Sequence, residues 1–298
     1  MAMKKDNFIG TATENRSGWL FVIPASLLIV IFGFYPMIKS LITSFKTGMG
    51  NNLVFTGASN YIRLFQDPVF KEAVKNTLIY LVIQVPIMTV LAMLNAVLLN
   101  DNTLKGKGFF RTALFLPSVT SLVAYSVLFK SLFAADGLFN KFLLAINVVN
   151  KPIPWLTDPF WAKVTIIIAI TWRWTGYNMI FYLASLQNID PSIYEAAKID
   201  GASGFTQFFK ITAPMLKPII LFTTIMSTNG TLQIFDEVVN ITAGGPANAT
   251  LSISQYIYNL CFKYTPNFGY ASAVSYSIVI MVAVLSFIQF RVAGDEND

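Results

Sequence analysis

The stretch "IDPSIYEAAKIDGASGFTQFFKITAP", residues 189–214, lies between two long apolar runs and carries five charged side chains. Charges at this density are too costly for a helix that crosses a bilayer. Asp190 and Pro191 form a typical helix start, and Gly201 tolerates the left-handed turn that ends a helix. Ser203 can cap a second short helix that ends before Pro214. The stretch therefore predicts a hairpin of two short amphipathic helices between membrane crossings.

The composition around this hairpin indicates an integral membrane protein. Of the 298 residues, 55% are hydrophobic and 12% are charged, whereas soluble domains are about 25% charged. The chain has no His and one cysteine, Cys261, which excludes an internal disulfide and a Cys/His metal site. The net charge is +6, but the Lys and Arg residues are scattered between apolar runs. No basic stripe offers a nucleic-acid site.

Six segments are long and apolar enough to cross about 30 Å of hydrocarbon, namely 19–41, 74–99, 110–133, 163–186, 218–239 and 270–290. Backbone groups in lipid must bond internally, so we expect an all-α integral membrane protein with six transmembrane helices. The first segment is too long for a signal peptide and lacks a cleavage site. Pro24, Pro86 and Pro117 are expected to bend their helices.

The six crossings divide the chain and place both termini on one side. The division predicts an N-terminal tail at 1–18, a first crossing at 19–41, an outer segment at 42–73, a five-helix core at 74–290 that holds the 189–214 hairpin, and a C-terminal tail at 291–298. Lys and Arg number ten on each face. Only the crowding of Lys105, Lys107 and Arg111 in one loop favours a cytoplasmic N-terminus.

The spacing within the hairpin resembles the EAA loop of permeases from binding-protein-dependent ABC importers. The family pattern is EAA, three residues, Gly, nine residues and I-x-L-P; the matching residues here are Glu195, Ala196, Ala197, Gly201, Ile211 and Pro214. Ala213 replaces the usual Leu. The resemblance implies that the hairpin, Asp200 included, couples the permease to a separate ATPase. The alternative is an amphipathic hairpin held on lipid headgroups.

Further segments resemble carbohydrate-importer permeases of the maltose-permease larger-subunit and glycerol-3-phosphate types. These are "RTALFLPSV", "TWRWTGYNMIFYLASLQNID" and "ITAGGPANAT". The resemblance implies a type I ABC importer permease fold in the bacterial cytoplasmic (inner) membrane, with both termini cytoplasmic. It also implies a heterodimer with a second homologous permease, a homodimer of ATPase subunits, and an extracytoplasmic sugar-binding protein that docks on loops including Gly244, Gly245 and Pro246. Because G-x-x-x-x-G-K-[ST] is absent from the sequence, ATP and Mg²⁺ are expected on the partner ATPase, with no cofactor, metal or catalytic residue in this chain.

A sugar site needs a wet cavity with hydrogen-bonding groups and aromatic faces. "TWRWTGYN" puts Trp172, Trp174, Tyr177 and Asn178 in mid-segment, and the last three share one helical face. Arg173 at the same depth is a candidate by default. It either binds substrate or pairs with an acidic side chain near the end of the fifth segment. The acidic residues there are Asp236 and Glu237.

The fifth segment adds Asn229, Gln233 and Asp236 on one stripe, and Ser118 and Thr120 follow the Pro117 bend. By resemblance, these regions line the sugar site of maltose-type permeases, in which Tyr177 aligns with a sugar-contacting Tyr. The alternative is that the polar groups bond neighbouring helices, at about 0.6 kcal/mol each, and that the Trp rings simply pack.

Together these features predict a carbohydrate permease subunit with no enzymatic activity of its own. An ion-coupled secondary transporter is the alternative, but its intramembrane carboxylates would have to be Asp236 and Glu237, and the hairpin would be unexplained. A membrane enzyme would require clustered His, Asp or Glu. The Trp pair favours a sugar ring, whereas Arg173 leaves phosphate esters open because Arg can bind phosphate as a fork.

Overall fold

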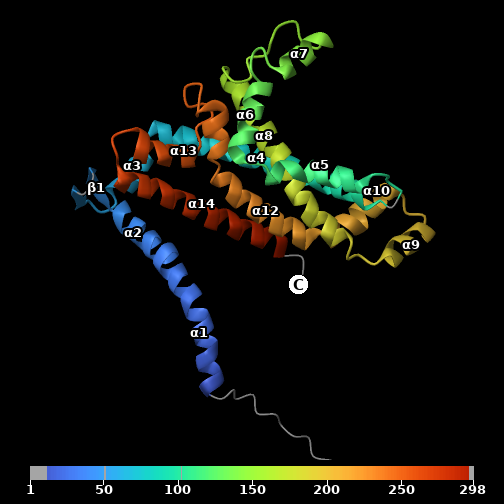
Figure 1. Cartoon of the computed structure of the whole chain (residues 1–298), viewed down its shortest axis with the longest axis horizontal. Helices are drawn as coiled ribbons and strands as arrows, with labels where there is room; N and C mark the ends of the chain where they lie inside the picture. The colour runs from blue at the N-terminus through green and yellow to red at the C-terminus, as the bar shows by residue number, and fades with distance from the viewer. Residues whose placement is uncertain (1–11, 50–51, 102, 295–298) are drawn as a thin grey trace, which may run out of the picture.

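The computed structural model describes residues 12–49, 52–101 and 103–294, which fold almost entirely as helices (Figure 1). The elements in chain order are α1 Ala12–Ile29, a π-helical turn η1 Val30–Phe34, α2 Tyr35–Ser44, β1 Lys46–Met49, β2 Asn52–Phe55, α3 Ser59–Leu64, α4 Pro68–Asn100, α5 Lys107–Val119, α6 Leu122–Leu132, α7 Leu138–Ala145, α8 Pro159–Leu186, α9 Pro191–Ile199, α10 Gly204–Gln207, η2 Phe208–Thr212, α11 Ala213–Met215, α12 Lys217–Leu232, η3 Val238–Thr242, α13 Ile253–Tyr258, η4 Asn259–Lys263 and α14 Phe268–Gly294.

Helices lie along all six predicted crossings, but not every crossing is one continuous apolar helix. Three continuous stretches in the described residues are long and apolar enough to span a membrane: Gly18–Ser44, Pro68–Asn100 and Phe268–Val292. Two bent pairs raise that number to as many as five, namely Lys107–Val119 with Leu122–Leu132 and Gly204–Met215 with Lys217–Leu232. The sixth, α8, has 28 residues, about 42 Å at ~1.5 Å per residue, but polar side chains such as Arg173 and Asn178 lower its hydropathy.

Two predicted crossings are wrong in detail because their helices break. The 110–133 segment bends by 102° between α5 and α6, because the backbone turns extended at Thr120 and Ser121. The 218–239 segment stops at Leu232 and resumes at η3. Helices α1, α4 and α5 run through Pro24, Pro86 and Pro117 without interruption.

The predicted segment boundaries also shift. Helix α1 begins at Ala12, inside the predicted N-terminal tail, and α14 continues to Gly294, past the predicted end of the core. Residues 1–11 and 295–298 of the predicted tails lie outside the described residues. The predicted all-α fold lacks one small element that the structure has, the antiparallel pair β1–β2 with Lys46 opposite Phe55.

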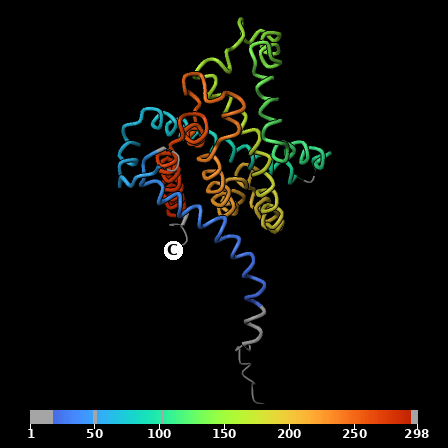
Figure 2. The backbone as a smooth tube through the Cα atoms, turned by 60° about the vertical axis from the view of Figure 1, so that its left-hand side comes forward, coloured from blue at the N-terminus to red at the C-terminus, as the bar shows by residue number. Residues whose placement is uncertain are grey.

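Helices α4 and α8 form the centre of the helix packing, with α5 against α8 and α12 against α4 and α14. The α5–α8 crossing is close because Gly176 has no side chain: a Cβ there would lie 1.8 Å from the Leu114 carbonyl oxygen. The first crossing, Gly18–Ser44, is different, since no residue of its apolar 18-residue window is buried. In both views it extends away from the body of the molecule (Figures 1 and 2).

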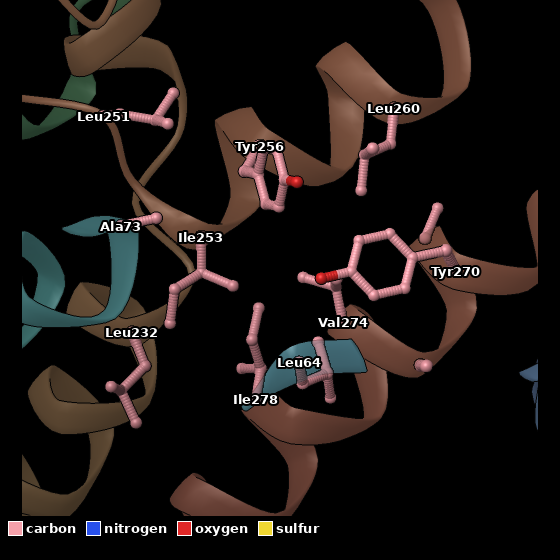
Figure 3. Packing of buried hydrophobic residues seen from close by; sticks show 12 residues of the cluster. Leu64, Ala73, Leu232, Leu251, Ile253, Tyr256, Leu260, Tyr270, Val274 and Ile278 are labelled. Carbon is pink, nitrogen blue, oxygen red and sulfur yellow. The ribbon is translucent and has the colours of Figure 1, made fainter. Parts of the chain in front are cut away.

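A buried cluster joins the start of α4 to α13 and α14 near the β-hairpin (Figure 3). Beside it, the Asp67 carboxylate caps α4 through the N–H groups of Val69 and Phe70. The same carboxylate accepts hydrogen bonds from the hydroxyls of Tyr256 and Tyr270. Burial raises the pKa of Asp67, but these hydrogen bonds outweigh it and hold the pKa below its ordinary value. One carboxylate thus ties three helices together.

Candidate functional site

A cavity of about 470 Å³ lies between α4, α8 and α12. Its wall includes six of the predicted substrate residues, namely Trp174, Tyr177, Asn178, Asn229, Gln233 and Asp236. A volume of about 300–1,000 Å³ is typical of pockets for small molecules. The structure therefore brings together the aromatic and polar groups that the sequence placed on two separate helices.

The aromatic side of this cavity is a row of rings from α8 and α12. Trp174 and Tyr177 meet edge to face with centroids 5.6 Å apart, Tyr177 and Phe181 lie 5.2 Å apart, and Phe222 follows at 6.0 Å from Phe181. The indole of Trp174 and the phenol of Tyr177 are partly exposed. Their spacing of three to four residues along α8 puts these rings on one face. The row offers apolar faces on which a sugar ring can stack.

The polar side of the cavity carries amides and carboxylates. Gln233 donates a hydrogen bond to the side-chain oxygen of Asn229, and the Asn178 amide donates to the Trp174 carbonyl at 3.0 Å. Among the described lining residues, the charged ones are Asp236 and Glu237. A carboxylate only accepts hydrogen bonds. The wall therefore suits a ligand that presents hydroxyl groups.

Arg173 does not line the cavity and forms no ion pair within 4 Å with Asp236 or Glu237 in the described structure. Arg173 is only 6% exposed, and its guanidinium reaches the break between α5 and α6. There it donates to the carbonyl oxygens of Pro117 at 3.0 Å, Thr120 at 3.1 Å and Ser118 at 3.2 Å. The predicted pairing with Asp236 or Glu237 is thus replaced by bonds to carbonyl groups that lack helical donors because α5 ends at Val119.

Three other predicted substrate residues also lie outside the cavity lining. The hydroxyls of Ser118 and Thr120 bond backward to the carbonyls of Phe115 and Pro117, at 2.7 and 2.8 Å. Trp172 points to the opposite face of α8, where its ring lies 5.3 Å from that of Phe129. Trp172, Arg173 and Trp174 are consecutive, so the helical period points their side chains in three different directions.

Sequence reasoning missed several lining residues, of which Gln84 and Thr231 are the most informative. The side-chain oxygen of Gln84 accepts a hydrogen bond from Thr231 at 3.1 Å, which joins α4 to α12 at the cavity wall. Gln84 is the only Gln or Asn between residues 77 and 94. A single amide in a long apolar stretch could have marked it as a candidate for the cavity. The sequence suggests Glu237 as a partner for Arg173 or as an ion-coupling carboxylate, and the structure places it in the cavity lining.

The 189–214 hairpin has the capping that the sequence predicts. The Asp190 carboxylate accepts from the Ser192 N–H at 2.9 Å, Gly201 has φ of +77°, and the Ser203 hydroxyl accepts from the Thr206 N–H at 3.2 Å. The second helix does not end before Pro214 but continues to Met215. The π-helical turn η2 directly precedes this last turn, so the helix passes through Pro214 although the proline has no N–H to donate. The paired hydroxyls of Tyr194 and Thr212 lie 3.0 Å apart.

The surface of this hairpin is open over the matched motif. No residue of α9 is buried, and the tip carries Ile199 and Phe205, which are 87% and 75% exposed. Glu195 and Ala196 are exposed, and Ala197 and Ile211 are half-buried. In Figure 1 the hairpin lies at the opposite end of the molecule from β1 and α3. Exposed apolar tips at the end of a membrane bundle are typical of a contact surface for another protein.

The loop with Gly244, Gly245 and Pro246 is held by internal bonds. Gly244 is buried, and the Thr250 hydroxyl donates to the Gly245 carbonyl at 2.8 Å. Asn76 of α4 donates to the Asn248 carbonyl at 2.9 Å. Gly244 is therefore poorly placed for the docking role predicted for it, whereas the neighbouring Ala247 and Asn248 are exposed.

Comparison with known proteins agrees with this geometry. Residues 69–294 match the family model described as "Binding-protein-dependent transport system inner membrane component". The lactose transport system permease protein LacF of Rhizobium radiobacter is 62% identical over 94% of this chain and 95% of its own length. The trehalose/maltose transport system permease protein MalF of Thermococcus litoralis is 32% identical over 92% of each chain.

The fold also matches a solved structure. The crystal structure of a bacterial ABC transporter involved in the import of the acidic polysaccharide alginate contains a chain that superposes with a TM-score of 0.84. The two chains are 23% identical, and the match covers 96% of this chain and 98% of that one. The family match spans most of the sequence and both relatives are covered nearly end to end. This chain belongs to the family of binding-protein-dependent transport system inner membrane components.

Proposed function

We propose that this chain carries a neutral disaccharide or short oligosaccharide inward through the cavity between α4, α8 and α12. The observation that carries the proposal is the pairing of an aromatic row with amides and carboxylates in a cavity of about 470 Å³. Sugar hydroxyls can donate to Asp236 and Glu237, and charge-assisted hydrogen bonds of this kind are about twice as strong as neutral ones. The similarity to a lactose permease supports the same substrate class.

The charges in the cavity argue against two other substrate classes. Acidic sugars and phosphate esters are anions, and a wall whose described charged residues are both acidic repels them. Arg173, the cation that left a phosphate ester open, instead has its two terminal nitrogens engaged by backbone carbonyls. A neutral sugar is the ligand that this wall favours.

The energy for transport comes from outside the chain in this proposal. A dimer of ATPase subunits binds ATP and Mg²⁺ and receives the 189–214 hairpin, whose exposed Glu195, Ala196 and Ile199 supply the contact. A second, homologous permease completes the membrane channel, and an extracytoplasmic sugar-binding protein delivers the substrate. Both termini are then cytoplasmic, in the bacterial inner membrane, on the side of the hairpin.

Uptake by proteoliposomes tests this proposal. The chain is purified with the subunits that accompany it, reconstituted with ATP inside, and supplied with a lactose-loaded binding protein. We expect ATP-dependent uptake of labelled lactose that unlabelled neutral disaccharides reduce and glycerol 3-phosphate does not. Stronger competition by glycerol 3-phosphate would contradict the substrate class. Uptake driven by an ion gradient without ATP would contradict the importer itself.

A further inference from the structure

A second hollow, of about 610 Å³, lies on the surface of α4 beside the end of α3. Its apolar part includes Leu78, Val82 and Ile83 on α4 and Phe65 just after α3. Phe65 and Val82 are 79% and 67% exposed. Leu78 and Val82 lie four positions apart and Ile83 is next to Val82, so the three form one stripe along the helix. The groove is therefore continuous with the surface of α4 and separate from the substrate cavity.

The length of the groove matches half of a bilayer. From Lys71 to Ile83 the helix rises about 18 Å at ~1.5 Å per residue, and the hydrocarbon core is about 30 Å thick. Helix α4 begins at Pro68, so Lys71 lies in its first turn and Ile83 near its middle. A groove that starts at a membrane interface and ends close to the midplane covers the depth of one lipid leaflet.

The interfacial end of the groove is basic. Lys71 and Lys75 line it one helical turn apart. The acid between them, Glu72, lies 3.5 Å from the Lys75 ammonium and 3.7 Å from that of Lys163 on α8. No described carboxylate lies within 4 Å of Lys71. The neighbouring Asp67 is engaged by two tyrosine hydroxyls. Cations therefore exceed anions at this end.

We propose that the groove binds one anionic phospholipid. Its phosphate lies between the ammonium groups of Lys71 and Lys75, and one acyl chain lies along Leu78 and Val82 with Phe65 as a wall. Two ammonium groups beside an apolar intramembrane surface attract an anionic headgroup by charge. A helix from another subunit would also cover the apolar stripe, but it would have to bring an acidic side chain to the two lysines.

Native mass spectrometry of the complex that contains the full chain tests the charged end. The detergent-purified complex is titrated with phosphatidylglycerol and, separately, with phosphatidylcholine. We expect tighter retention of phosphatidylglycerol, and about 30-fold weaker retention after the double substitution Lys71→Gln and Lys75→Gln. The control Lys141→Gln with Lys151→Gln removes the same charge from exposed lysines elsewhere and should change nothing. Equal retention by wild type and the Lys71/Lys75 variant would overturn the proposal.

A second pair of variants tests the apolar part. Val82→Trp fills the groove and should reduce phosphatidylglycerol retention. The control Val127→Trp enlarges a residue on α6 that is 53% exposed and should leave retention intact. A photoreactive benzophenone amino acid at position 65 should crosslink to phospholipid. Crosslinking to a second permease subunit instead would assign the groove to a protein helix and overturn the lipid site, whether or not the chain transports sugar.

Discussion

The two bent helix pairs of this chain are held in different ways. The 102° bend between α5 and α6 depends on Arg173 of α8, which donates to three carbonyl oxygens at the break. The 67° bend between Gly204–Met215 and α12 keeps its own backbone bonds, with Leu216 N–H donating to the Thr212 carbonyl and Ile220 N–H to that of Leu216. One bend needs a distant side chain, and the other is local.

The difference has consequences for stability and for function. When a side chain from another helix bonds the free carbonyls at a break, it fixes the break against that helix. Arg173 therefore holds α5 and α6 against α8 and the cavity wall. A local bend can change its position without losing an internal hydrogen bond. The hairpin attached to it is therefore suited to move as a unit with a partner protein.

The largest effect is expected at the distant contact. Arg173→Ala leaves buried carbonyl groups without donors, at about 1–3 kcal/mol for each such group, and should lower the unfolding temperature of the purified complex and abolish uptake. Arg173→Lys keeps the charge but loses the forked geometry, so it should fall between wild type and Arg173→Ala in a thermal melt. An unchanged melting temperature for Arg173→Ala would show that the bend is also local.

The next effect concerns coupling. Gly201→Ala places a Cβ in the left-handed region, at about 1–2 kcal/mol, and should change the angle between the two hairpin helices. We expect uptake and substrate-stimulated ATP hydrolysis to fall while the melting temperature of the complex hardly changes.

Gly204 provides a matched control for this variant. Neither Gly201 nor Gly204 has a heavy atom within 4 Å of an added Cβ, but only Gly201 has a positive φ. Gly204→Ala should therefore transport normally. Equal loss in both variants would point to an effect of the added methyl group rather than of the turn.

A smaller effect is expected in the cavity that lies between the bends. Tyr177→Ala removes one ring of the aromatic row and should raise the KM for sugar uptake by up to about tenfold, since an aromatic contact contributes ~0.5–1.5 kcal/mol. Trp172→Ala removes a ring that packs on Phe129 outside the lining and should leave KM unchanged. A raised KM in Trp172→Ala alone would reverse the assignment of the two faces of α8.

The smallest effect is expected at the hairpin cap. Hydrogen bonds from Ser192 lower the pKa of Asp190 below its ordinary 3.8. A carboxyl with a depressed folded-state pKa contributes stability that is present above the unfolded pKa and is lost as pH falls through the folded pKa. Asp190→Asn should therefore reduce the hydrogen-exchange protection of α9 at neutral pH. In this variant, acidification should no longer lower that protection, as it does in the wild type. Asp200→Asn, at the other end of α9, should keep that decrease.

Features that depend on neighbouring residues in the chain could be predicted from the sequence. The Asp190 and Ser203 caps and the left-handed Gly201 are local, and the structure has all three. The shared face of Trp174, Tyr177 and Asn178 follows from the helical period, and these residues do line one cavity.

Features that depend on tertiary contacts could not be predicted. The sequence places Arg173 in the middle of a membrane segment, but its carbonyl partners are brought to it only when α8 packs against the α5–α6 break. Gln84 reaches the cavity because α4 packs on α12, which brings Thr231 within 3.1 Å. The burial of Gly244 likewise follows from the fold of its loop against α4 and α13 rather than from the turn residues themselves.

The contact between Gly176 and the Leu114 carbonyl has a consequence for how this sequence can diverge. An added Cβ at position 176 would sit 1.8 Å from a backbone oxygen, and no rotamer change can relieve a clash with backbone. Position 201 differs, since Asn also adopts the left-handed region. In a saturation library selected for growth on the transported sugar, we expect glycine alone to survive at 176, whereas asparagine should survive beside glycine at 201.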